Sequence, residues 1–195
     1  ASLLDSTTAS SISYIKIHSD RFSSEPEKKS NIIFIDIGDT SMDVSIASLS
    51  QKSIDIKGLS TDRTINGRHF TEKLEEFLIQ KVQSKYNIDP RSNKRSILRF
   101  QQATEKVKKA LSANPQIMFE VPSLMNDIDI SIPVKREEFV ELIQKDIEKV
   151  TFTIQQALES CHLTKDDISA IEILGGGSRV PAIKAQIKAF FGREP

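Results

Sequence analysis

Residues 36–40 could form a ligand-binding turn between two strands. The apolar, β-branched run at residues 32–37 is typical of a buried strand, and a second apolar run follows the turn. Gly38 can adopt a positive φ and let a ligand approach the backbone, and the N–H groups of such a turn can bind phosphate. Asp36 and Asp43, on either side of the turn, could hold a divalent cation through its water molecules. An ordinary hairpin with solvated acids explains the same residues, and this stretch alone favours that simpler interpretation.

Three of the seven glycines are consecutive, at positions 175–177. They follow an expected buried strand and precede an expected helix, which is the usual geometry for seating an anionic or nucleotide ligand at a helix N-terminus. Adjacent glycines let a flat ligand surface approach the backbone. Arg179, just beyond them, could stack its guanidinium on a base or bind an anion. A plain turn would need only one glycine, so the triplet indicates a ligand site about as well as it indicates a turn.

Two weaker patterns could belong to the same site. Glu105, Lys108 and Ser112 are three and four residues apart, so a helix would place them on one face, where they could bind ribose and base edges. Such a face is more often a solvated surface. Gly67 and Arg68 precede another expected helix, whose N-terminus favours an anion. A simple turn is the commoner reason for that pair.

Hydrophobic periodicity predicts the elements that would position these residues. Asp5 or Ser6 is the expected cap of the first helix, residues 23–30 are an expected exposed loop, and a bend is expected at Val150 and Thr151. Helices are expected at residues 5–14, 70–86, 92–112, 135–161 and 183–191, and strands at 31–37, 44–49, 53–59, 116–121, 128–132 and 168–174. This order predicts an α/β fold with a mixed sheet, in which residues 1–63 and 143–195 form a larger subdomain and residues 64–142 a smaller, inserted α/β subdomain.

The composition excludes several classes of protein. Charge is balanced, with 27 basic and 27 acidic residues, so we expect neither a nucleic-acid partner nor a membrane partner. No apolar stretch approaches the roughly 20 residues that span a bilayer, and no signal peptide is expected. The single cysteine, Cys161, fits a reducing compartment, so a cytoplasmic location is expected. Because the sequence opens without Met and stops at Pro195, we expect it to be a piece of a longer protein.

Taken together, the three motifs resemble lobe II of the actin-like ATPase domain of heat-shock chaperones. In the seventy-kilodalton class the hairpin is DLGGGTFDVS, the adenosine helix ERAKRTLS and the last motif VGGSTRIP. The corresponding stretches here are residues 36–45 (DIGDTSMDVS), 105–112 (EKVKKALS) and 174–181 (LGGGSRVP). The resemblance covers essentially the whole chain, in order and spacing.

The departures favour the hundred-and-ten-kilodalton branch of that superfamily. Asp39 and Thr40 replace two glycines of the seventy-kilodalton class, and the branch also lacks those glycines. Asp39 brings a negative charge to the place where the β- and γ-phosphates would lie, which is expected to weaken binding. Arg68 and Gly177 also fit the branch better, whereas Asp43 agrees with the seventy-kilodalton class and keeps that alternative open.

The resemblance implies a nucleotide site for ATP or ADP with Mg²⁺. Asp36 would lie near the magnesium through water, in the full domain. The residues that it implies near the phosphates are Gly38, Asp39, Thr40 and Gly67, and those around adenosine are Glu105, Lys108, Ser112, Gly175, Gly176, Gly177 and Arg179.

For function, the resemblance implies a nucleotide-exchange factor and holdase whose partners are a seventy-kilodalton chaperone and unfolded clients. The alternative is an ATP-hydrolysing chaperone of the seventy-kilodalton class. A sugar kinase or a filament protein on the same fold would not explain residues 105–112. Whether the protein is an enzyme is left open, because the chain lacks the family's second phosphate loop and catalytic lysine and is expected to be inactive alone.

Overall fold

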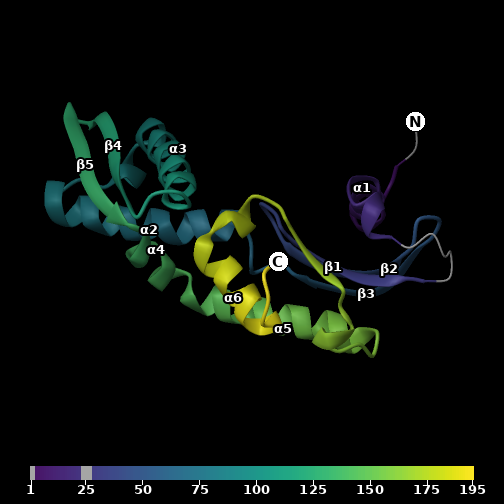
Figure 1. Ribbon diagram of the computed structural model, residues 1–195. Coiled ribbons are helices and arrows are strands. Elements are labelled where there is room, and N and C mark those ends of the chain that lie inside the picture. Colours follow the sequence, from purple (N-terminus) through teal and green to yellow (C-terminus); the bar gives the residue numbers. More distant parts are fainter. Residues whose placement is uncertain (1–2, 23–27) are drawn as a thin grey trace.

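The computed structural model describes residues 3–22 and 28–195 (Figure 1). Its larger sheet has the strand order β3-β2-β1-β6. The strands β1 (Ser30–Ile37), β2 (Met42–Leu49) and β3 (Ile54–Asp62) form an antiparallel meander, and β6 (Ala170–Leu174) pairs with β1 in parallel. This mixed sheet, with the helices packed on it, confirms the predicted α/β class.

The central residues of β1, 32–35, are apolar on both sides because both faces of the sheet are covered. Ile33 and Ile35 belong to the main core, which they share with α5 (Gln144–Ser160) and α6 (Pro181–Phe191). Ile32 and Phe34 face the other way and pack in a second cluster with Tyr14 of α1 (Ser6–Ile17). Figure 1 shows α1 on one side of the sheet and α5 and α6 on the other.

A second, two-stranded sheet lies at the other end of the molecule (Figure 1). It consists of β4 (Gln116–Met125) and β5 (Ile128–Lys135), joined at Asn126 and Asp127, which both have positive φ as a tight hairpin turn requires. Helix α3 (Lys94–Leu111) packs on β4, where the rings of Phe100 and Phe119 meet edge to face at 4.7 Å.

Helix α2 (Gly67–Tyr86) runs from the two-stranded sheet to the near end of the larger sheet in Figure 1. One apolar cluster runs from the larger sheet through α2 to β4 and β5, so the two parts share a core. The predicted subdomain boundaries after residues 63 and 142 stay a prediction.

The predicted helix over residues 135–161 is two helices, and the predicted bend at Val150 is wrong. The break between α4 (Arg136–Leu142) and α5 falls at Ile143, whose φ of −103° and ψ of 10° leave the α-helical region. Ile143 is fully buried, as is Val150 inside α5. Packing of these side chains in the core therefore decides the backbone, and it outweighs the weak helix propensity of β-branched residues.

The remaining boundaries differ little from the predicted ones. Asp5 caps α1 by accepting a hydrogen bond from the N–H of Thr8, as expected, but the helix continues to Ile17. Most of the predicted loop at 23–30 lies outside the described residues. Short 3₁₀ helices complete the chain: η1 (Ser19–Arg21), η2 (Pro90–Ser92), η3 (Lys165–Asp167) and η4 (Gly177–Arg179). Among the described residues, no helix is both long and apolar enough to cross a bilayer.

Candidate functional site

A cleft of about 340 Å³ brings together the three motifs identified in the sequence. Its walls come from the β1–β2 turn, the start of α2, one face of α3, and η4 with the start of α6. The lining residues are Gly38, Asp39, Gly67, Phe70, Glu105, Lys108, Lys109, Ser112, Gly176, Gly177, Arg179 and Val180. Of the residues predicted to bind nucleotide, only Thr40 and Gly175 are missing from this lining.

Lys108 has three polar partners in the cleft, and only 12% of its side chain is exposed. Its Nζ donates to the carbonyl oxygen of Gly67 at 2.8 Å and to the hydroxyl of Thr71 at 2.7 Å, and it lies 2.8 Å from Oε2 of Glu105. The Thr71 hydroxyl in turn donates to Glu105 at 2.6 Å. The network ties the polar face of α3 to the first turn of α2.

Glu105 is ionised in this network. Partial burial raises the pKa of its carboxyl, but the hydrogen bonds from Lys108 and Thr71 outweigh that effect and bring the pKa below its usual value. The face of α3 therefore presents a fixed carboxylate beside a fixed ammonium group, which suits hydroxyl groups that both donate and accept hydrogen bonds.

The N-terminus of α2 does not offer the anion site that its sequence suggested. The N–H of Gly67 donates to the carbonyl oxygen of Gly38 at 2.8 Å, and that of Arg68 donates to the carbonyl oxygen of Asp39 at 3.0 Å. The N–H of His69 is capped by the side chain of Asn66 at 2.8 Å. Because these N–H groups are already used, the start of α2 serves to anchor the β1–β2 turn.

The carboxylate of Asp39 is paired with a neighbouring cation, and its expected weakening of phosphate binding stays a prediction. A guanidinium nitrogen of Arg68 donates to Oδ2 of Asp39 at 2.8 Å, and both side chains are largely exposed, at 62% for Arg68 and 68% for Asp39. In the sequence, these two departures from the seventy-kilodalton pattern look independent. The structure joins them in one ion pair at the edge of the cleft.

The three consecutive glycines are not equivalent in the structure, because packing requires glycine at the first and third positions only. Gly175 has a φ of +80°, and a Cβ there would lie 2.3 Å from the carbonyl oxygen of Ile37. A Cβ on Gly177 would lie 2.7 Å from the Ile37 side chain. Both glycines are therefore required by packing against β1. Gly175 does not line the cleft itself.

Gly176 and Gly38 are different, because the fold does not require glycine at either position. Gly176 has an ordinary helical backbone with φ −72°, and a Cβ on it would meet no protein atom within 4 Å. Gly38 does not adopt the positive φ considered above, and a Cβ there would make only an ordinary contact of 3.7 Å. Both line the cleft.

Asp36 lies behind the same turn, opposite Asp43 in the β1–β2 register. Burial, and then the neighbouring Asp43 carboxylate, raise the pKa of Asp36. Asp43 accepts hydrogen bonds from the hydroxyls of Ser41 at 2.6 Å and Thr61 at 2.7 Å. The described residues contain no cluster of three or more His, Cys, Asp or Glu side chains placed to hold a metal. The predicted water-mediated contact of Asp36 with a cation stays a prediction.

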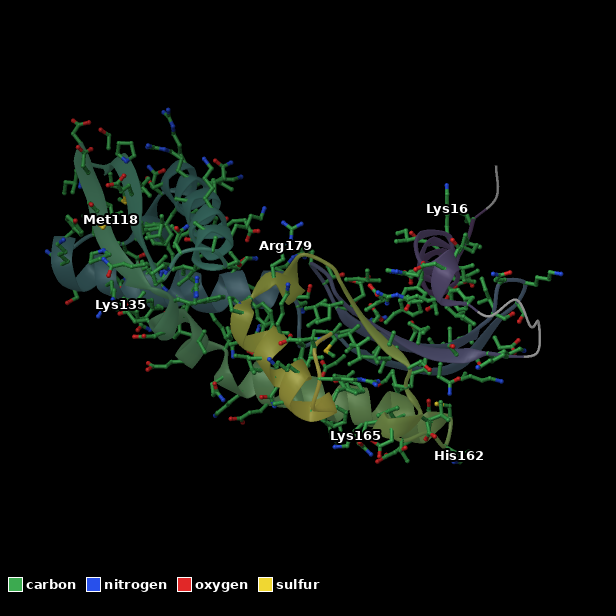
Figure 2. The ribbon with its side chains drawn as sticks, viewed as in Figure 1. Lys16, Met118, Lys135, His162, Lys165 and Arg179 are labelled. Carbon is green, nitrogen blue, oxygen red and sulfur yellow. The ribbon has the colours of Figure 1, made fainter. Side chains whose placement is uncertain are left out.

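Sequence reasoning missed four residues of the site. Phe70 and Val180 form an apolar part of the cleft wall. Both side chains are also buried, and an apolar residue in the sequence carries no sign that separates such a position from the core. Thr71 was not considered, although it lies one turn after Gly67. Lys109 lies one position after Lys108, outside the spacing of Glu105, Lys108 and Ser112, yet it lines the cleft and its Nζ lies 3.2 Å from Glu105, the residue four positions before it. Figure 2 shows Arg179 at the turn between the larger sheet and α6.

Comparison with known proteins gives the same family as the motifs. The family model described as Hsp70 protein matches residues 2–195. Heat shock protein hsp88 of Neurospora crassa is 40% identical over 86% of this chain and 24% of the relative. A heat shock protein homolog of Eremothecium gossypii is 36% identical over 98% of this chain and 27% of the relative. Heat shock 70 kDa protein 4 of Homo sapiens is 34% identical over 98% of this chain and 23% of the relative.

The chain thus spans about a quarter of the length of these relatives. The match runs over both sheets and every motif that lines the cleft, so it concerns the site as well as the fold. This chain belongs to the Hsp70 family.

Proposed function

We propose that the cleft binds an adenine nucleotide and that the chain is one lobe of a nucleotide-binding domain of a chaperone. In this assignment Glu105, Lys108 and Ser112 hold the ribose and base, together with the Gly176 turn and Arg179. Gly38, Asp39, Thr40 and Gly67 face the phosphates. Magnesium, when bound, would neutralise phosphate charge, and Asp36 would hold one of its water molecules.

The observation that carries the proposal is the pair of glycines that the fold does not need. Gly38 and Gly176 both line the cleft, and neither has a strained φ or a close neighbour that would exclude a side chain. Glycine loses more conformational freedom on folding than any other residue, so its presence costs stability unless it has a use. A ligand that lies directly on the backbone gives glycine a use at these two positions, one on each wall.

The test is a titration of the chain with adenosine and with ADP, followed by amide chemical shifts, in the native chain and in Gly176→Leu. The native chain is expected to show saturable shifts for Gly176, Arg179 and the α3 residues. Gly176→Leu should keep the unfolding temperature within the range of neutral surface changes. It should weaken binding at least about tenfold, the equivalent of about 1.4 kcal/mol.

Lys184→Ala is the matched control, because Lys184 is exposed on α6 and does not line the cleft. It should leave both stability and binding unchanged. Unaltered adenosine binding by Gly176→Leu, or shifts of equal size far from the cleft, would contradict the assignment of the site.

For the longer protein, we propose nucleotide exchange on a seventy-kilodalton heat-shock chaperone, together with holding of unfolded clients in the cytoplasm. Support comes from the Asp39–Arg68 pair, which lies at the edge of the cleft beside the turn where the hydrolysing class has only glycine backbone. The test is release of a fluorescent ADP from a seventy-kilodalton chaperone on addition of the full-length protein. Acceleration supports exchange, whereas fast hydrolysis of ATP by the full-length protein itself would favour the alternative, a true ATPase.

A further inference from the structure

We propose that Arg68 binds the nucleotide phosphates and that Asp39 is a built-in competitor for the same guanidinium. This inference rests on the proposed function, and it identifies the Arg68 guanidinium as the group that binds the phosphates at the edge of the cleft. In the absence of ligand, the carboxylate of Asp39 occupies the position of a phosphate oxygen on Arg68, at 2.8 Å.

The cations around the cleft are not equally available to an anion. Arg179 has no ion-pair partner among the described residues, but it lies beside the glycine motif that is assigned to adenosine. Lys108 is held by Glu105, Thr71 and the carbonyl oxygen of Gly67, with only 12% of its side chain exposed. Lys109 lies at the far edge of the same carboxylate, 3.2 Å from Glu105. Arg68 is bound by one exposed carboxylate alone, among the described residues, and 62% of its side chain is open to solvent.

An exposed ion pair of this kind is weak, because water screens both charges. A guanidinium can bind two oxygens of a phosphate at once, which makes phosphate a strong competitor for it. The exchange therefore moves Arg68 from Asp39 to the phosphate and leaves Asp39 in solvent.

The backbone permits this exchange without rearrangement. The β1–β2 turn stays attached to α2 through the Gly67-to-Gly38 and Arg68-to-Asp39 backbone hydrogen bonds, at 2.8 and 3.0 Å. Only the two side chains have to separate. Because those N–H groups already donate to carbonyl oxygens of the turn, the start of α2 binds a phosphate through the Arg68 side chain.

The experiment measures binding of pyrophosphate, ADP and adenosine to the full chain and to Asp39→Asn, Arg68→Gln and the double variant, at low salt. Asp39→Asn should bind pyrophosphate and ADP about two- to fivefold more tightly, which is the range of a released exposed ion pair. Arg68→Gln should bind them more weakly than the native chain. The double variant should resemble Arg68→Gln, and adenosine should bind all four equally.

The double variant separates the proposal from plain repulsion. If it keeps the gain of Asp39→Asn, the gain comes from removing a negative charge and the role of Arg68 is refuted. Absence of any gain in Asp39→Asn also overturns the proposal. Asp89→Asn is the matched control, because Asp89 and Arg91 form an exposed pair remote from the cleft. It should leave the binding of pyrophosphate, ADP and adenosine unchanged.

The adenosine and pyrophosphate arms also distinguish a failure of the nucleotide site from a failure of the Arg68 exchange. Adenosine that binds to none of the variants would contradict the nucleotide site itself. Pyrophosphate would still show whether Asp39 competes for Arg68. Both side chains are exposed and neither packs in the core, so circular dichroism and unfolding temperature should show that the variants fold normally.

Discussion

At the scale of single residues, Arg179 and Lys109 are two cations of the cleft that come from different elements. Lys109 is 73% exposed and lies 3.2 Å from Glu105, whereas Arg179 has no ion-pair partner among the described residues. Arg179→Ala is expected to weaken adenosine binding by roughly 0.5–2 kcal/mol, the range of a guanidinium stacked on an aromatic ring. Lys109→Ala should lose less. Calorimetry on the two variants decides the matter, and equal losses would remove the special role of Arg179.

Asp36 gives a prediction of opposite sign for stability and for function. Its pKa is raised by burial and by Asp43, so the ionised carboxylate costs stability at every pH above its folded pKa. Asp36→Asn should therefore raise the unfolding temperature at pH 7, and the gain should shrink as the pH falls toward the ordinary carboxyl pKa of about 3.9. Magnesium-dependent nucleotide binding by the full-length protein should fall.

Asp43→Asn is the contrasting variant for Asp36. It removes the Asp43 charge that repels the Asp36 carboxylate. It also disturbs the hydrogen bonds that Asp43 accepts from Ser41 and Thr61. Its unfolding temperature should not rise. A rise in Asp43→Asn but none in Asp36→Asn would show that burial of Asp36 has no energetic cost.

The sequence predicted most residues of the site, but not which of them pair with each other and which are required by packing. The motif residues were predicted because their order and spacing are local properties of the chain. The Asp39–Arg68 pair joins positions 29 residues apart, so only the fold reveals it. In the same way, sequence alone treats Gly175, Gly176 and Gly177 as equivalent, whereas β1 excludes a side chain at the first and third of them.

At the scale of elements, the join of α4 and α5 is held to α2 by a buried ion pair. Asp146, with 4% of its side chain exposed, lies 2.8 Å from Nζ of Lys73, which also donates to the carbonyl oxygen of Leu142. Lys73→Met removes the ammonium group nearest to the buried carboxylate and leaves it with the His69 imidazole at 3.7 Å. The expected cost is somewhat below the roughly 3–5 kcal/mol of a fully buried pair, because Lys73 is 29% exposed.

The double variant Lys73→Met/Asp146→Leu should recover part of that loss, because it removes the unpaired charge. Urea unfolding gives both free energies. Lys81→Met is the comparison on the same helix, since the pair of Lys81 and Glu138 is about one-third exposed on each side and should cost under about 1 kcal/mol. A double variant less stable than Lys73→Met would show that the pair is not the source of the effect.

Element types were predictable from periodicity, but the break at Ile143 was not. The apolar positions of residues 135–161 continue without interruption through the break, so the pattern reads as one helix. The backbone leaves helical geometry at Ile143 while this residue stays fully buried. Such a break depends on contacts with α2 and the core, which no local pattern contains.

At the scale of the whole molecule, the cleft surrounds the phosphate position on one side only, and this limits the chemistry expected of the chain. Phosphoryl transfer needs positioning and charge stabilisation on every side of the γ-phosphate. The described residues supply the β1–β2 turn, Asp36 and Arg68 on one side, and Lys108 is already engaged with Glu105. We therefore expect no useful ATP hydrolysis by this chain alone, although adenosine and ADP should bind weakly.

Single-turnover hydrolysis with magnesium and excess chain checks this expectation, beside the variant Asp39→Gly/Thr40→Gly. That variant restores the glycines of the seventy-kilodalton class but adds no catalytic group, so it should bind ATP more tightly without hydrolysing it faster. Turnover by the native chain at the rate of an intact seventy-kilodalton chaperone would refute the argument. In the full-length protein the same two changes test a different point. Faster hydrolysis by that variant would show that the Asp39–Arg68 pair limits the rate of the full-length protein.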